Sequence, residues 1–180
     1  IEQPDRADRV VFDLDPGSDV AWDRVAAAAR LVRRRLTQLG LASFLRTTGG
    51  KGLHVVVPLN PGCPWAQAKD FARAFASTLA QDHPLEFIAT ASKAQRHGLI
   101  YVDYLRNSRG ATSVASYSLR ARSGAPVAMP LRWNELGKLK SGHAFDIHSA
   151  PRRLARLRTD PWAGIDEVRQ DLDEIMKKLG

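Results

Sequence analysis

Apolar residues recur along this chain at two spacings, which separate predicted helices from predicted strands. Over residues 22–39 they step by three and four positions, the pattern of an amphipathic helix, and Gly40 is expected to end it. The same spacing predicts helices over 64–81 and 162–179, and a shorter helix is expected over 132–139. These elements supply the helical part of the fold.

Short apolar runs bounded by turn residues predict the strands. Six segments are expected to be extended, namely 9–15, 43–46, 53–59, 99–103, 112–119 and 125–130. The second and third of these are joined by a glycine-rich turn, which predicts a hairpin. Together with the helices, they predict a mixed α and β fold of the α+β class, with one largely antiparallel sheet flanked by helices.

Size and composition narrow the range of functions. A chain of 180 residues is long enough for one domain, which we expect to span 1–180. With 27 Lys and Arg against 19 Asp and Glu, the net charge is +8, so the surface should attract polyanions, above all nucleic acid. The chain has a lone Cys63, no zinc-ligand spacing and no apolar stretch long enough for a membrane, which together indicate a cytoplasmic protein.

Three acidic residues stand where predicted strands end. Asp13 and Asp15 close the first strand as D-L-D, so their side chains lie on the same face, and Asp103 closes the run I-Y-V-D. Carboxylates at the end of a buried strand need a cation or another partner to offset their charge. They can form a two-metal site for nucleotidyl transfer, although D-x-D before Pro-Gly also commonly begins a turn.

The turn of the predicted hairpin is rich in glycine. Gly49, Gly50 and Gly52 let backbone amides approach an anion, and Lys51 adds a positive charge beside them, which suits a triphosphate. The turn lacks the Walker A spacing and leads into a strand instead of a helix. A plain hairpin turn with a solvated lysine remains an alternative, as does a structural role for His54.

Arginines cluster after the third acidic residue. Arg106, Arg109, Arg120 and Arg122 surround a segment rich in Ser and Thr, where bidentate arginines can bind phosphate groups. Arg96 is a weaker candidate for contacts with a template or nucleotide. Some of these side chains are expected only to cover the surface.

Two other classes of function fit parts of this pattern. The segment V-V-F-D-L-D-P-G-S resembles the first motif of haloacid-dehalogenase-like phosphohydrolases, but the later acidic cluster 171–174 falls on a predicted helix instead of a strand end. A non-catalytic nucleic-acid-binding module is the other alternative. It predicts weak metal binding with salt-sensitive DNA binding.

A series of motifs from about residue 4 to residue 162 resembles the polymerase domain of bacterial DNA ligase D, a member of the archaeo-eukaryotic primase superfamily. The matching segments, in chain order, are F-D-L-D-P, T-T-G-G-K-G-L-H-V-V-V-P-L, S-K-A-Q-R-x-G-x-I-Y-V-D-Y-L-R-N-x-R-G-A-T, Y-S-x-R-A-R and P-L-R-W. The resemblance implies a catalytic core with an RNA-recognition-like sheet. It also implies a template-dependent DNA/RNA polymerase of bacterial non-homologous end joining, which prefers ribonucleotides and uses a divalent cation, Mn²⁺ in preference to Mg²⁺.

The family's site residues can be carried over motif by motif. The resemblance implies that Asp13, Asp15 and Asp103 are the metal ligands. It implies that the nucleotide is held by Thr48, the glycine-lysine turn, His54 and Arg120, and that Arg96 and Arg106 lie along the nucleic acid. The implied partners are DNA with breaks or gaps, ribonucleoside and deoxyribonucleoside triphosphates, the Ku end-binding protein and a ligase domain.

The family domain also has an N-terminal α/β half that this sequence is expected to lack. In the family, that half carries lysines for the 5′-phosphate of the downstream strand and an aromatic platform for a base. We therefore expect the 180 residues to be the catalytic part of such a domain.

Overall fold

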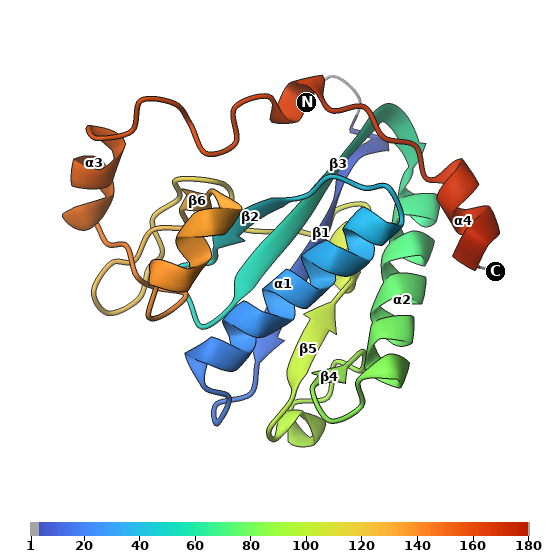
Figure 1. The fold of residues 1–180 in the computed structure, drawn as a ribbon, viewed down its shortest axis with the longest axis horizontal. Helices are drawn as coiled ribbons and strands as arrows, with labels where there is room; N and C mark the ends of the chain where they lie inside the picture. Colours follow the sequence, from blue (N-terminus) through green and yellow to red (C-terminus); the bar gives the residue numbers. More distant parts are fainter. Residues whose placement is uncertain (1–3, 180) are drawn as a thin grey trace.

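The computed structural model describes residues 4–179, and its centre is one six-stranded sheet (Figure 1). The strands lie in the order β4-β5-β1-β3-β2-β6. All neighbours pair antiparallel except β4 and β5, which are parallel. Their bounds are β1 Arg6–Pro16, β2 Phe44–Thr47, β3 Leu53–Pro64, β4 Phe87–Ile88, β5 Ile100–Asp103 and β6 Pro130–Leu131. The predicted α+β fold and the β2-β3 hairpin are confirmed.

Two long helices cover one face of this sheet (Figure 1). They are α1 (Trp22–Gln38) and α2 (Trp65–Asp82), each within two residues of its predicted bounds. Their inward residues at helical spacing, such as Val32 on α1 and Phe71 on α2, are fully buried against Phe12 of β1. The main hydrophobic core therefore lies between the helices and this face, and it fixes β1 at the centre of the sheet.

Alternation along β1 gives the two faces of the sheet different characters. Val10, Phe12 and Leu14 point into the helix-covered core and are fully buried. Val11 and Asp13 lie on the opposite face, because successive side chains of a strand point to opposite sides. At one end of that face, Val11 packs with Val56 and Trp162 in a separate apolar cluster. The rest of that face carries polar residues.

The helix predicted over 162–179 is wrong in its first two thirds. The chain forms only a short 3₁₀ helix, η4 (Ile165–Glu167), and then α4 (Asp173–Leu179). Gly164 has a φ of 84°, which a helix cannot continue through, and the Trp162 indole donates to the Leu45 carbonyl at 2.8 Å. This segment therefore crosses the sheet as an irregular strap, visible at the top of Figure 1.

The predicted strands over 112–119 and 125–130 are also largely wrong. These residues are irregular apart from two isolated bridges, Leu119 with Val127 and Pro126 with Asp146, and β6 begins only at Pro130. Tyr117 and Ala125 adopt positive φ, which interrupts extended pairing. The expected helix over 132–139 is a 3₁₀ helix, η3 (Trp133–Lys138), and the pattern missed α3 (Ser149–Leu154).

Two more 3₁₀ helices flank β5. They are η1 (Ala94–Arg96), before the strand, and η2 (Leu105–Asn107), directly after it. None of the helices within residues 4–179 is both long and apolar enough to cross a membrane.

Candidate active site

Strand register places four polar side chains in one row across the helix-free face. Arg46 of β2 is the cross-strand partner of His54 on β3, which is the partner of Asp13 on β1, which in turn is the partner of Asp103 on β5. Directly opposed residues have Cβ atoms about 5 Å apart, so each side chain reaches the next. The β2-β3 hairpin, β1 and β5, which are distant in the sequence, therefore contribute to one row of polar side chains.

Asp13 and Asp103 share a cation in this structure. The Arg106 Nε lies 3.1 Å from Asp103 Oδ2 and 3.6 Å from Asp13 Oδ2. Asn107 fixes the turn that carries this arginine, because its side-chain amide accepts from the Val11 N–H at 2.7 Å and donates to the Val11 carbonyl at 2.9 Å. A side chain thus continues the hydrogen-bond ladder where β5 has ended.

Asp15 lies two residues further along β1 on the same face and has a different partner. Its carboxylate accepts from Arg96, whose guanidinium also lies 4.4 Å from the centre of the Tyr101 ring. The Tyr101 hydroxyl in turn donates to Asp103 Oδ1 at 3.2 Å, and burial together with that carboxylate raises the pKa of Tyr101. The three predicted acidic residues are therefore connected through arginine and tyrosine side chains.

The glycine-lysine turn is wedged against β1 by close backbone contacts. A Cβ added to Gly52 would lie 2.1 Å from the Leu14 carbonyl oxygen, between the two acidic positions of β1. Gly49 has a φ of 66°, and its N–H donates to the Gly142 carbonyl at 3.1 Å. A Cβ on Gly142 would lie 2.6 Å from the Gly52 oxygen. Only glycine allows these approaches, so the loop requires its sequence for steric reasons.

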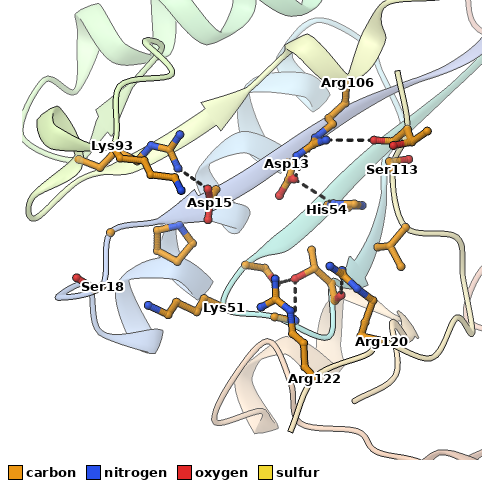
Figure 2. Close-up of a pocket in the computed structure, with 18 residues that line it drawn as sticks. Asp13, Asp15, Ser18, Lys51, His54, Lys93, Arg106, Ser113, Arg120 and Arg122 are labelled. Carbon is orange, nitrogen blue, oxygen red and sulfur yellow. Dashed lines mark hydrogen bonds and ion pairs between the residues drawn. The ribbon is translucent and has the colours of Figure 1, made fainter. Parts of the chain in front are cut away.

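Thr48 and Arg120 fix the rest of this loop. The Thr48 hydroxyl donates to the Gly52 carbonyl and accepts from the Gly50 N–H, both at 3.1 Å. Arg120 donates to the Thr48 carbonyl at 2.8 Å. The exposed Lys51 side chain extends beside the loop, as Figure 2 shows. The predicted nucleotide-binding residues are thus assembled around one turn.

These groups line one cleft of about 740 Å³ (Figure 2). Ten of the predicted site residues line it, namely Asp13, Asp15, Thr48, Gly50, Lys51, Gly52, His54, Arg96, Arg106 and Arg120. Gly49 and Asp103 do not line the cleft themselves. Gly49 belongs to the turn that lines it, and Asp103 contacts Arg106. Ser18 and Ser113 also line the cleft, although no sequence pattern indicated them as site residues. Arg46, Asn107 and Gly142 were also missed. Only strand register and backbone packing reveal the last three.

Positive charge dominates the electrostatics of the cleft. Burial works to raise the pKa of Asp13, but the hydrogen bond from His54 and the charges of Arg106 and Arg120 outweigh it, so the pKa lies below its ordinary value. Asp13 is therefore a carboxylate at neutral pH. A cleft with this excess of donors suits a polyanion such as a triphosphate.

The donor chemistry fits a divalent cation. Asp13 and Asp103 present carboxylate oxygens from directly paired positions, and Arg106 already bridges them as a cation. Carboxylate oxygens are the ligands that Mg²⁺ and Mn²⁺ favour. Within residues 4–179, no three His, Cys, Asp or Glu side chains are gathered closely enough to hold a metal ion. The Asp15 carboxylate pairs with Arg96, and those of Asp13 and Asp103 pair with Arg106.

Comparison with known proteins identifies the family. The family model described as LigD, primase-polymerase domain, matches residues 1–162. The chain belongs to this family. It is 44% identical over 97% of its length to the multifunctional non-homologous end joining protein LigD of Pseudomonas aeruginosa, covering 21% of that protein. It is 28% identical over 84% of its length to the bifunctional LigD protein of Bacillus subtilis, covering 25% of that protein.

A solved structure of this family shares the fold. The polymerase domain of Mycobacterium tuberculosis ligase D, in complex with DNA, matches with a TM-score of 0.83 and 36% identity, over 90% of this chain and 56% of that chain. The chain thus spans about a fifth of the P. aeruginosa protein and little more than half of the solved domain. The expected primase-polymerase fold is confirmed for the part of the family domain that this chain covers.

Proposed function

We propose that this LigD-family chain is the catalytic part of a template-dependent nucleotidyltransferase. It would act as a DNA/RNA polymerase that fills gaps and extends broken ends in bacterial non-homologous end joining. One observation carries the proposal: the Asp13 carboxylate, directly paired with that of Asp103 behind it, lines the same cleft as a glycine loop shaped to approach an anion. The family assignment favours this function over a phosphohydrolase.

Each part of the cleft has a place in this reaction. Asp13, Asp15 and Asp103 would hold the divalent cations, Mn²⁺ in preference to Mg²⁺. When bound, such ions lower the energy of charge that develops on attacking and leaving oxygens. The amides of the glycine loop, together with Lys51 and Arg120, would bind the triphosphate.

The two arginines on the carboxylates have a second role in this proposal. Arg96 and Arg106 neutralise Asp15, Asp13 and Asp103 in this structure, which keeps the buried negative charges paired. When cations take these carboxylates, both guanidinium groups become free for phosphates of the nucleic acid. Catalysis would then rest on position and charge, without a covalent protein intermediate.

The wider context is part of the same proposal. The substrates would be DNA with breaks or gaps and nucleoside triphosphates, with ribonucleotides preferred. The bacterial relatives are named as non-homologous end joining proteins. In such a cytoplasmic repair reaction the partners would be Ku and a ligase domain. The N-terminal α/β half of the family domain would supply contacts to the downstream strand.

The test is extension of a 5′-phosphorylated gapped duplex with Mn²⁺ or Mg²⁺ and each ribonucleotide or deoxyribonucleotide. Templated addition that is lost in Asp13→Ala/Asp15→Ala is the expected result. Asp70→Ala is the matched control, because Asp70 is an exposed carboxylate of α2 that pairs only with Arg73 among the described residues. Salt-sensitive DNA binding without any addition would instead support a non-catalytic binding module.

A further inference from the structure

Arg46 is a buried cation with neutral neighbours. The residue is 5% exposed, and its guanidinium contacts His54 Nδ1 at 2.8 Å, Ser116 Oγ at 3.3 Å and the Trp162 ring at 5.3 Å from the ring centre. No ion pair joins it to a carboxylate of residues 4–179, and its Nε has no hydrogen-bond partner there. Burying an arginine in this way is costly, so its position calls for a compensating role.

The contact between Arg46 and His54 determines where the imidazole carries its hydrogen. A guanidinium has five N–H donors and no acceptor, so the Nδ1 atom that it contacts at 2.8 Å must be the acceptor. A neutral imidazole whose Nδ1 accepts carries its hydrogen on Nε2. That Nε2 lies 3.5 Å from Asp13 Oδ2 and faces the cleft. His54 therefore presents a donor to the cleft.

We propose that Arg46 is a positioning residue that holds the hydrogen of His54 on Nε2, so that the ring can donate to a phosphate oxygen of the nucleotide. The proposal rests on the nucleotide site proposed above. Phosphate and carboxylate oxygens only accept hydrogen bonds, so a ring that turned a bare nitrogen toward them would repel both. Arg46 acts one strand away from the cleft and touches no substrate.

A purely structural role makes different predictions. Arg46 also joins β2 to Ser116 and to the strap that carries Trp162, and it could serve only to hold these segments together. In that case its loss would lower stability and leave the imidazole unchanged. Arg153 provides the matched control, because it is also poorly exposed and lies 5.2 Å from an aromatic ring, but it pairs with Glu135.

The first measurement is the ¹⁵N NMR spectrum of the histidine rings at mildly alkaline pH, where a ring nitrogen with hydrogen is readily distinguished from one without. The chain has five histidines, and the His54 signals are assigned by their loss in His54→Gln. In the native protein we expect a bare Nδ1 and a protonated Nε2. Arg46→Met should move hydrogen onto Nδ1, whereas Arg46→Lys, which keeps a donor, and Arg153→Met should not.

The second measurement is the nucleotide KM in gap filling by Arg46→Met, His54→Ala and the double variant. A hydrogen bond to a charged group is lost in each, so KM should rise about tenfold or more with a smaller change in kcat. If Arg46 acts through His54, the double variant should be no worse than His54→Ala alone. Arg46→Lys should restore most of the nucleotide affinity.

The two measurements separate this proposal from the proposed function. A native His54 with hydrogen on Nδ1, or on both nitrogens, would overturn the role of Arg46 whatever the activity. Unchanged ring signals in folded Arg46→Met, or additive KM effects in the double variant, would also overturn it. Absence of nucleotide addition by the native protein would refute the proposed function, while the NMR result would still decide the state of His54.

Discussion

The two faces of β1 use alternate residues of one strand for opposite purposes. Phe12 and Leu14 are fully buried against the helices, whereas Asp13, between them, faces His54 and the charged Arg106 on the other side of the sheet. The apolar face gains free energy from burial, at roughly 25 cal/mol per Å². The polar face contains buried charges, which contribute little or negatively to stability.

This difference explains how the site residues are held in precise positions although they add little to the stability of the fold. Each carboxylate takes its place from the register of a strand whose other face is locked in the core, since a slip of one residue would exchange the two faces. The helices α1 and α2 therefore position Asp13 and Asp103 from the opposite face of the sheet. Mutations on the two faces should separate activity from stability.

The largest expected effect is loss of activity from Asp13→Asn. The substitution keeps size and removes the charge that pairs with Arg106 and His54, so we expect nucleotide addition to fall by at least about a hundredfold to a thousandfold. The melting temperature should change little. A gapped-duplex assay and thermal denaturation on the same preparation test this, and activity near the native level would exclude Asp13 from the metal site.

On the opposite face of β1, Phe12→Ala should lower the stability of the fold more than the activity of the folded protein. Phe12 is fully buried and packs on Phe75 at 4.7 Å and Phe71 at 6.2 Å between ring centres. Removing such a ring costs about 3–5 kcal/mol in the free energy of unfolding. Urea denaturation measures this, with residual activity assayed well below the new midpoint. Full activity of the folded fraction would support the separation of the two faces.

The sequence was a good guide wherever one periodicity controlled a segment. Helices α1 and α2 and the strands β1 and β5 follow their hydrophobic patterns closely, because each buries one regular face. Strand β3 begins where predicted but continues to Pro64, beyond the predicted end at residue 59. Residues 112–130 and 160–172 could not be predicted in this way. Their paths depend on side chains bonded to distant backbone, such as Trp162 to Leu45 and Gln170 to Ala42 and Pro58.

The same limit applies to the candidate site. Asp13, Asp103 and the glycine loop stand at strand ends and turns, so sequence patterns located them. Arg46 and Gly142 carry no such signal, because an arginine in a short strand and a glycine in a loop are ordinary at the level of sequence. Their importance arises from the β2-β3 register and from the contact of two loops.

Glycine substitutions test the packing of the glycine loop against β1. A methyl group at Gly52 would lie 2.1 Å from the Leu14 oxygen, so Gly52→Ala must displace β1 or the loop, at a cost of about 1–3 kcal/mol. Nucleotide affinity should fall as well. Gly137→Ala is the control, since Gly137, like Gly52, lies outside the positive-φ region, and an added Cβ there would meet only the flexible end of the Arg30 side chain, at 3.3 Å. Equal effects in both variants would show that the close approach to the Leu14 oxygen is not responsible.

The smallest expected effect is on stability in acid. The pKa of Asp13 in the folded protein lies below its ordinary value of 3.8, so the folded state binds the proton less readily than the unfolded state. Its contribution is complete above pH 3.8 and is lost as the pH falls through the lower pKa of the folded state. Asp13→Asn should therefore show a shallower loss of stability than the native protein below this pH. Urea midpoints measured from about pH 2.5 to about pH 5, roughly one unit either side of the ordinary value, test this. If stability falls with pH equally in the native protein and in Asp13→Asn, the pKa of Asp13 is the same in the folded and unfolded states. The ion pairs around Asp13 would then stabilise its carboxylate no more than water does.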